Sequence, residues 1–164
     1  MTLRADAQRN LDRLLDVAGE CFAERGLDCS IDEIARRARI GHGTVFRRFA
    51  TKDELVTAVL ARQLALLTAR ATEAAAADDA WDGFERFLRA AGEQYSANLA
   101  LIGAFERSIG SLAKDELTGA VSGLVRRAQR AGVLRRDVVA EDVMRLVPAA
   151  AQYPDVVLDG LRAR

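Results

Sequence analysis

The sequence has few of the residues on which catalytic and metal-binding proteins usually depend. Its 164 residues include one histidine, two cysteines and two prolines. A Ser-His-Asp arrangement is implausible when the single histidine stands at the start of a helix. Two cysteines and a distant histidine do not make a zinc site. We therefore expect no enzyme, no catalytic residue, no metal and no cofactor.

The formal net charge of the chain is zero, because 24 basic residues balance 24 acidic ones. This balance excludes a globally basic DNA-binding protein, but it allows a local basic patch. Residues 30–53 carry six basic and three acidic side chains, so this segment is positive and the rest of the chain is negative. Such a distribution is typical of a small DNA-reading segment on an otherwise neutral body.

No uninterrupted apolar run approaches the length of a membrane span, and the N-terminus is charged too early for a signal peptide. We therefore expect a cytoplasmic protein with no membrane partner and with reduced cysteines. Cys21 falls on the apolar face of the first predicted helix, where a small core residue fits. Cys29 is expected in the loop beside it.

The residues that are abundant favour helix almost everywhere, since Ala, Leu, Arg and Glu dominate. Apolar residues at steps of three and four predict an amphipathic helix over residues 10–22, which Gly26 ends. Ser30, with Glu33 three residues later, is a capping box that starts a second helix. A short turn follows, in which Gly41 is available for a positive φ.

The third predicted helix is short, with Val45, Phe46 and Phe49 as its apolar anchors. Thr51 caps a fourth helix, whose apolar stripe continues to Leu67. A linker is expected over residues 74–79. Further helices are predicted over residues 81–96, 99–110, 114–131, 141–152 and 154–162. Pro148 either ends or kinks the helix over residues 141–152. The predicted fold class is all-α.

Two short helices joined by a tight turn, with a third helix packed in front, describe a helix-turn-helix. Its second helix must present groups that reach phosphates and base edges. Arg47, Arg48, Thr44 and His42 supply that face. Gly43 lets the backbone approach DNA and leaves amide N–H groups free for a phosphate.

Four stretches of this sequence resemble the N-terminal domain of the tetracycline-repressor (TetR) family. They are AERG at 23–26, SIDEIA at 30–35, GTVFRRF at 43–49 and KDEL at 52–55. The third resembles the family's recognition helix, G-T-L-Y-x-H-F, and the fourth its K-E-x-L opening of helix four. Arg39 stands where the family usually has the glycine of the turn.

The resemblance implies a role for each matching residue. Ser30, Thr44 and Lys52 would contact phosphates, whereas His42, Arg47 and Arg48 would face bases or phosphates in the major groove. Phe46 stands where the family usually has a phosphate-contacting tyrosine. The chain would then be a ligand-responsive transcriptional repressor that binds a near-palindromic operator in double-stranded DNA as a homodimer. Residues 1–53 would bind DNA, and residues 54–164 would bind the ligand and form the dimer.

An effector cavity is implied by the resemblance rather than by residue spacing. An apolar or aromatic small molecule would contact Trp81, Phe84, Leu88, Tyr95, Ile102, Phe105, Leu124 and Val125. These side chains could equally fill a solid core. An alternative function is a helical dimeric sensor or interaction module that does not bind an operator.

Overall fold

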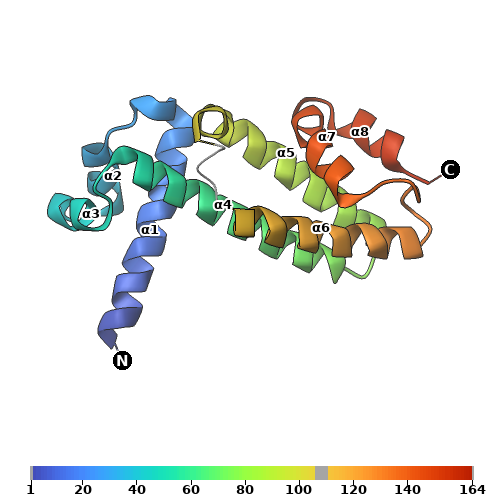
Figure 1. Cartoon of the computed structure of the whole chain (residues 1–164), viewed down its shortest axis with the longest axis horizontal. Coiled ribbons are helices and arrows are strands. Elements are labelled where there is room, and N and C mark those ends of the chain that lie inside the picture. The colour runs from blue at the N-terminus through green and yellow to red at the C-terminus, as the bar shows by residue number, and fades with distance from the viewer. Residues whose placement is uncertain (1, 106–110, 164) are drawn as a thin grey trace. The chain divides into compact units, whose positions relative to one another are not determined.

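The computed structural model describes residues 2–105 and 111–163, and the fold is all-α as predicted (Figure 1). The helices are α1 (Thr2–Arg25), the 3-10 helix η1 (Gly26–Asp28), α2 (Ile31–Ala38), α3 (His42–Arg48), α4 (Lys52–Ala75), α5 (Ala80–Phe105), α6 (Ser111–Arg130), α7 (Ala140–Gln152) and α8 (Pro154–Leu161). Within the described ranges, β pairing is confined to one isolated bridge between Leu134 and Arg162.

The chain divides into two compact units. Unit 1 comprises residues 1–62 and 97–109, and unit 2 comprises residues 63–96 and 110–164, each where described. Helices α4 and α5 therefore contribute residues to both units. The predicted functional division after Asp53 concerns DNA and ligand binding, and it stays a prediction.

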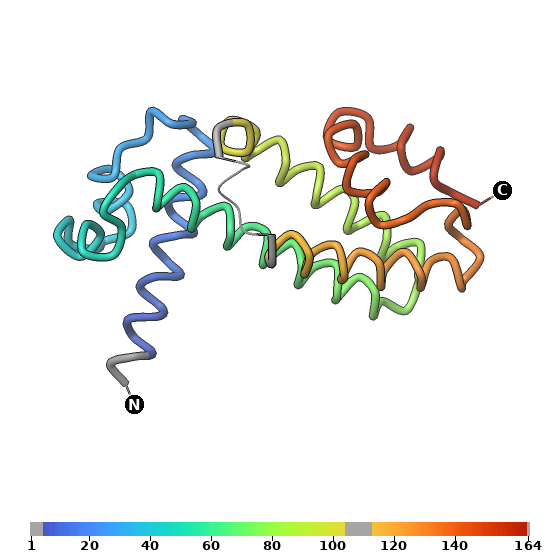
Figure 2. The backbone as a smooth tube through the Cα atoms, in the orientation of Figure 1, coloured from blue at the N-terminus to red at the C-terminus, as the bar shows by residue number. Residues whose placement is uncertain are grey.

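Unit 1 is built around the helix-turn-helix, and its four N-terminal helices follow one another closely along the chain (Figure 2). Helices α2 and α3 have eight and seven residues. Helices this short do not persist alone in water, so they depend on packing. The buried side chains they share with α1 and α4 include Phe22, Ile34, Ala38, Val45, Phe49, Leu55 and Val59.

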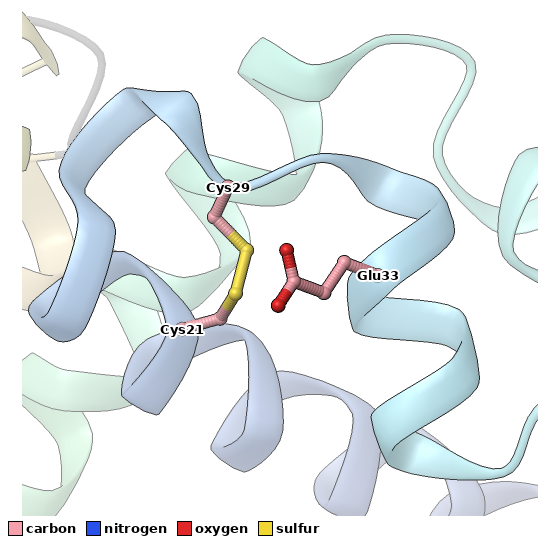
Figure 3. A group of neighbouring side chains, drawn as sticks. All are labelled: Cys21, Cys29 and Glu33. Carbon is pink, nitrogen blue, oxygen red and sulfur yellow. A yellow bond between two sulfur atoms is a disulfide. The ribbon is translucent and has the colours of Figure 1, made fainter.

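The two cysteines form a disulfide, so the expectation of reduced cysteines is wrong for this structure (Figure 3). Gly26, the first residue of η1, adopts a φ of +56°, which turns the chain back onto α1. The Cα atoms of Cys21 and Cys29 consequently lie 6.0 Å apart, within the range a disulfide can bridge. Both residues are fully buried, and the predicted core position of Cys21 is confirmed.

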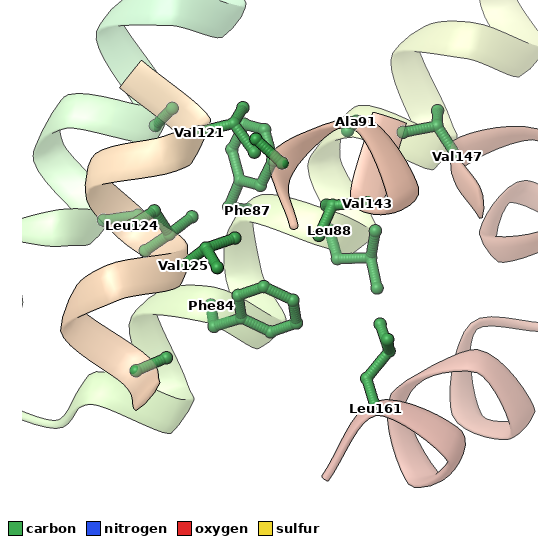
Figure 4. Close-up of a cluster of buried hydrophobic side chains, with 14 of the residues drawn as sticks. Phe84, Phe87, Leu88, Ala91, Val121, Leu124, Val125, Val143, Val147 and Leu161 are labelled. Atoms are coloured by element: carbon green, nitrogen blue, oxygen red, sulfur yellow. The ribbon is translucent and has the colours of Figure 1, made fainter. Parts of the chain in front are cut away.

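Unit 2 has its own hydrophobic core, to which α4, α5, α6, α7 and α8 contribute. Figure 4 shows Phe87 of α5 beside Val121 of α6, and Phe84 beside Val125. The backbone also closes this unit, because the amide of Ala163 donates to the carbonyl of Val133 over 3.0 Å. Gly132 has a φ of +74° in the turn that follows α6.

Some of the predicted helix boundaries differ clearly from those observed. Helix α1 begins at Thr2 rather than near residue 10, because the preceding residues are also helix formers. Two helices were predicted over residues 81–96 and 99–110, but α5 is continuous to Phe105, with neither glycine nor proline near Ala97 to break it. Residues 106–110 lie outside the described part.

Pro148 does not end α7, which continues through it to Gln152. The break comes instead at Tyr153, and Pro154 occupies the first turn of α8, where its missing N–H costs no hydrogen bond. The last two helices have 13 and 8 residues. Their lengths agree with the short helices predicted over residues 141–152 and 154–162.

Helix α4 is long and apolar enough, by length and composition, to meet the criterion for a membrane span. Buried helices of soluble proteins meet the same criterion. Its apolar side chains belong to the two cores: Leu55 and Val56 in unit 1, Leu67 and Ala71 in unit 2. Between them, Arg62 forms ion pairs with Asp12 and Asp16 of α1.

The turn between α2 and α3 places a positive φ at Arg39 and not at Gly41. Arg39 lies in the left-handed region with φ 54° and ψ 42°, whereas Gly41 has a φ of −61°. The amide of Ile40 reaches the carbonyl of Ala35 over 3.0 Å and closes the end of α2. The prediction for Gly41 is therefore wrong, because the chain reverses two residues earlier. A non-glycine residue in this region costs about 1–2 kcal/mol.

Replacing Arg39 with glycine should therefore stabilise the protein. We expect Arg39→Gly to raise the free energy of unfolding by about 1 kcal/mol, because glycine adopts this conformation without a steric penalty. The matched control is Arg36→Gly on the exposed face of α2, which should lower it by about 1 kcal/mol. Urea unfolding followed by circular dichroism measures both changes. Equal destabilisation by the two variants would contradict the assignment of strain to Arg39.

Candidate nucleic-acid interface

The first helix of the helix-turn-helix is capped as the sequence predicts, but only on one side. The Ser30 hydroxyl accepts a hydrogen bond from the amide of Glu33 over 3.2 Å. The Glu33 carboxylate does not complete the reciprocal half of the capping box. It accepts instead from Arg25 at 2.5 Å and from Arg37 at 2.8 Å, and so ties α2 to the end of α1.

Arg37 is therefore a structural residue and not a free surface charge. Its guanidinium donates to Glu24 over 2.7 Å and to Glu33 over 2.8 Å. These hydrogen bonds, the one to Glu24 first, raise the pKa of Arg37 above its ordinary value. Arg62 is similar, because its hydrogen bond to Asp16 raises its pKa and ties α1 to α4. Both side chains serve the scaffold of unit 1.

Helix α3 turns one face inward and one outward. Val45 of α3 and Phe49, which directly follows the helix, are buried in the core of unit 1. The outward residues are exposed: His42, Gly43, Thr44, Phe46, Arg47 and Arg48. Phe46 is 40% exposed, so its predicted role as an apolar anchor is wrong. It follows Val45 by one residue, about 100° around the helix, and therefore points away from the core.

The polar contacts on this outward face are local. His42 Nε2 lies 2.7 Å from a carboxylate oxygen of Asp32, and the His42 ring stands 4.4 Å from that of Phe46. Arg47 donates to the Thr44 hydroxyl over 3.2 Å. Within the described residues, neither Arg47 nor Arg48 forms an ion pair. Their positive charge is therefore not neutralised by a neighbouring carboxylate.

Lys52 lies at the start of α4, where Thr51 caps the helix by accepting from the amide of Glu54 over 3.2 Å. The Lys52 ammonium donates to the carbonyl of Leu27 and lies 6.0 Å above the Phe22 ring. Lys52 is half-buried, which distinguishes it from the fully exposed arginines of α3. It thus links the start of α4 to the segment between α1 and α2.

A groove of about 510 Å³ runs beside α3 and is shared with the N-terminal half of α1. Its lining comprises Ala7, Gln8, Asn10, Leu11, Leu14, Ile40, Thr44, Arg47 and Arg48. Gln8 and Asn10 are not among the predicted DNA-contacting residues, because the first helix was expected to begin only near residue 10. The longer α1 brings these two amide side chains next to the arginines of α3.

The residues predicted to line an effector cavity do not all lie together. Phe84, Leu88, Leu124 and Val125 are buried in the core of unit 2, with Trp81 and Tyr95 packed against it. Ile102 packs instead against the core of unit 1. The side chain of Phe105 lies outside the described part. The effector site stays a prediction.

Comparison with known proteins gives two family matches that together cover most of the chain. Residues 14–59 match the model of bacterial regulatory proteins of the tetR family. Residues 76–163 match the C-terminal domain described as transcriptional regulator SbtR-like. The two matches fall on the helix-turn-helix and on the helices that follow α4, respectively.

Among solved structures, a TetR transcription regulatory protein from Mycobacterium vanbaalenii is 35% identical, with a TM-score of 0.84 over 98% of this chain and 99% of that chain. The regulator SCO0520 from Streptomyces coelicolor is 26% identical, with a TM-score of 0.75 over 93% of this chain and 98% of that one. This chain belongs to the TetR family of bacterial transcriptional regulators.

A curated relative, the HTH-type transcriptional repressor Rv3405c of Mycobacterium tuberculosis, is 54% identical over 48 residues. That match spans 29% of this chain and 26% of the relative. The chain therefore matches only about a quarter of the length of this curated repressor. The fold of the whole chain is shared with the two solved structures.

Proposed function

We propose that this chain is a cytoplasmic, ligand-responsive repressor that binds a near-palindromic operator as a homodimer, with α3 in the major groove. The observation that carries the proposal is the pair Arg47 and Arg48, which are exposed on α3 and free of carboxylate partners in the described residues. Arg25, Arg37 and Arg62 of the same unit all bind carboxylates. An exposed arginine fork without an acidic partner fits guanine edges and phosphates.

The surrounding residues complete a surface for phosphates. Ser30 and Thr44 offer hydroxyl groups, and Gly43 has open space around the position of an added side chain. Lys52 would add a positive charge at the start of α4, and His42 and Phe46 form the edge of the face. These groups fix the register of a protein on DNA, whereas the two arginines would select the sequence.

The length of α3 argues for a dimer. Seven residues span about 10 Å, which covers only about three base pairs and is too little for specificity. Short helices α7 and α8 leave Tyr153 62% and Val156 72% exposed. Val143, Val147 and Leu161 of the same two helices are buried in the core of unit 2 and are not available for a dimer contact. We therefore place the dimer contact on Tyr153, Val156 and the half-buried Val157.

The effector would be an apolar or aromatic molecule that enters the core of unit 2 between α5 and α6. Its candidate contacts are aliphatic and aromatic, so an isolated charge would be costly to bury there. Tyr95 is half-buried and would supply a hydrogen-bond donor. The Arg162 guanidinium lies 4.8 Å from the centre of the Trp81 ring, so one charged group does border this region.

Selection of bound duplexes from a random pool tests the proposed function. We expect enrichment of a motif with two-fold symmetry, because two copies of α3 would read equivalent half-sites. The affinity should fall steeply with salt, since each phosphate contact releases counterions. A pool with no enriched motif would favour the alternative of a sensor without operator binding.

Arg47→Ala and Arg48→Ala should each weaken binding to the selected duplex by about 1–3 kcal/mol if they contact bases. Lys52→Ala should weaken binding to all sequences about equally, because a phosphate contact carries no sequence information. The matched control is Arg86→Ala on α5 of unit 2, which should leave affinity unchanged. Fluorescence anisotropy titrations measure all four variants. Wild-type affinity in both α3 variants would place the reading surface elsewhere.

Val156→Glu should convert the dimer to a monomer, since a carboxylate in an apolar interface lacks a partner. The variant should keep its helical content, because Val156 contributes little to the core. Leu99→Glu, on an apolar side chain that is 54% exposed in unit 1, is the control and should remain dimeric. Sedimentation velocity distinguishes the two states. An unchanged dimer in Val156→Glu would move the interface away from α8.

A further inference from the structure

The disulfide lies at the corner where α1 leads into the helix-turn-helix. It joins Cys21 on the buried face of α1 to Cys29, the residue that follows η1 and precedes the N-cap of α2. We propose that Cys21 and Cys29 are a reversible oxidation site whose state sets the affinity of the α3 surface for DNA. This inference rests on the proposed function. Nothing in operator binding itself requires a disulfide at this position.

Two of the predicted phosphate contacts are attached to the segment that the disulfide closes. Ser30 follows Cys29 directly, and the Cys29 sulfur lies 3.9 Å from the Ser30 carbonyl oxygen. Lys52 donates to the carbonyl of Leu27, within the closed segment. A displacement of residues 27–29 therefore moves both predicted contacts. No other disulfide or free cysteine competes for this role, as Cys21 and Cys29 are the two cysteines of the chain.

The surroundings of the disulfide leave little room for its reduced form. Both cysteines are fully buried, and the Glu33 carboxylate lies within 4.8 Å of the sulfur atoms (Figure 3). Arg25 and Arg37 hold that carboxylate in place. Two thiol sulfurs cannot remain at a bonded distance, and a close-packed interior absorbs such a change by shifting its elements. The shift falls on the Cys29 segment, because α1 is the longer and better-anchored element.

The reaction is a two-electron exchange. A dithiol reductant attacks one sulfur of the disulfide as a thiolate, forms a mixed disulfide and then closes on itself, which leaves Cys21 and Cys29 as thiols. The dithiol is oxidised to a cyclic disulfide, and its two hydrogen atoms pass to the protein. In the reverse direction, a hydroperoxide oxidises the two thiols to the disulfide and is itself reduced to an alcohol and water. Disulfides of cytosolic proteins are usually of this transient or sensing kind.

Burial also predicts how DNA should affect the reaction. Neither sulfur is accessible in the folded state, so reduction requires the corner between α1 and α2 to open. DNA bound to Ser30 and Lys52 would hold that corner closed. The oxidised protein should therefore react with dithiothreitol several-fold more slowly when it is bound to its operator, because the corner must open before the reagent reaches either sulfur.

The test compares the affinity of full-length protein for the selected duplex in two states. One sample is oxidised with hydrogen peroxide, and the other is reduced with dithiothreitol. Alkylation under denaturing conditions followed by mass spectrometry counts the free thiols in each. We expect none in the oxidised sample, two in the reduced sample, and an affinity about tenfold lower after reduction. Re-oxidation should restore the affinity.

The double variant Cys21→Ala/Cys29→Ala is the control, with circular dichroism to check that it folds. It should not respond to either reagent, because it has no cysteine to oxidise or reduce. Should it fail to fold, the re-oxidation cycle of the wild-type protein decides the question by itself. A response of the folded variant to hydrogen peroxide would overturn the proposal.

Four other outcomes would overturn the proposal, and they differ in what else they contradict. Two free thiols in the peroxide-treated protein would show that no disulfide forms. Equal affinities of the oxidised and reduced proteins would reject the switch and leave operator binding intact, whereas absence of DNA binding in both states would reject the proposed function as well. A DNA affinity that changes on addition of zinc or of EDTA would assign Cys21, Cys29 and Glu33 to a metal site instead.

Discussion

Packing against α1 and α4 is the constraint on which the rest of unit 1 depends. Helices of eight and seven residues have too few internal hydrogen bonds to offset the cost of nucleation. Val45 and Phe49 therefore define where α3 lies, because they insert into a core that Phe22 and Leu55 complete. The direction of the polar face follows from that insertion. Arg47 and Arg48 are displayed outward because Val45 before them and Phe49 after them are held inward.

The arginine side chains of unit 1 fall into two groups, one paired with carboxylates and one not. Arg25, Arg37 and Arg62 neutralise carboxylates and connect helices to one another. Arg47 and Arg48 remain on the surface and form no ion pair among the described residues. A chain with no net charge can thus display positive charge on α3 while other arginines of unit 1 are paired with carboxylates that join its helices.

Most of the fold could be predicted from the sequence, since the spacing of apolar residues and the caps at Ser30 and Thr51 are local signals. The α3 face was also predictable, because helical periodicity separates Val45 and Phe49 from Thr44 and the arginines. The disulfide was not, since the approach of Cys29 to α1 depends on the conformation of Gly26. Phe46 was misassigned because its apolar character outweighed its position on the helix. Ile102 was grouped with the wrong core because α5 was not expected to pass through both units.

The groove between α1 and α3 has a practical consequence for handling the protein. Gln8 and Asn10 of α1 border the same hollow as Arg47 and Arg48, so the beginning of the chain lies next to the surface that would face DNA. An affinity tag or fluorophore attached there would crowd that surface and add its own charge to it. The other end is held to the turn after α6 through Ala163. Labels and immobilisation linkers belong at that end.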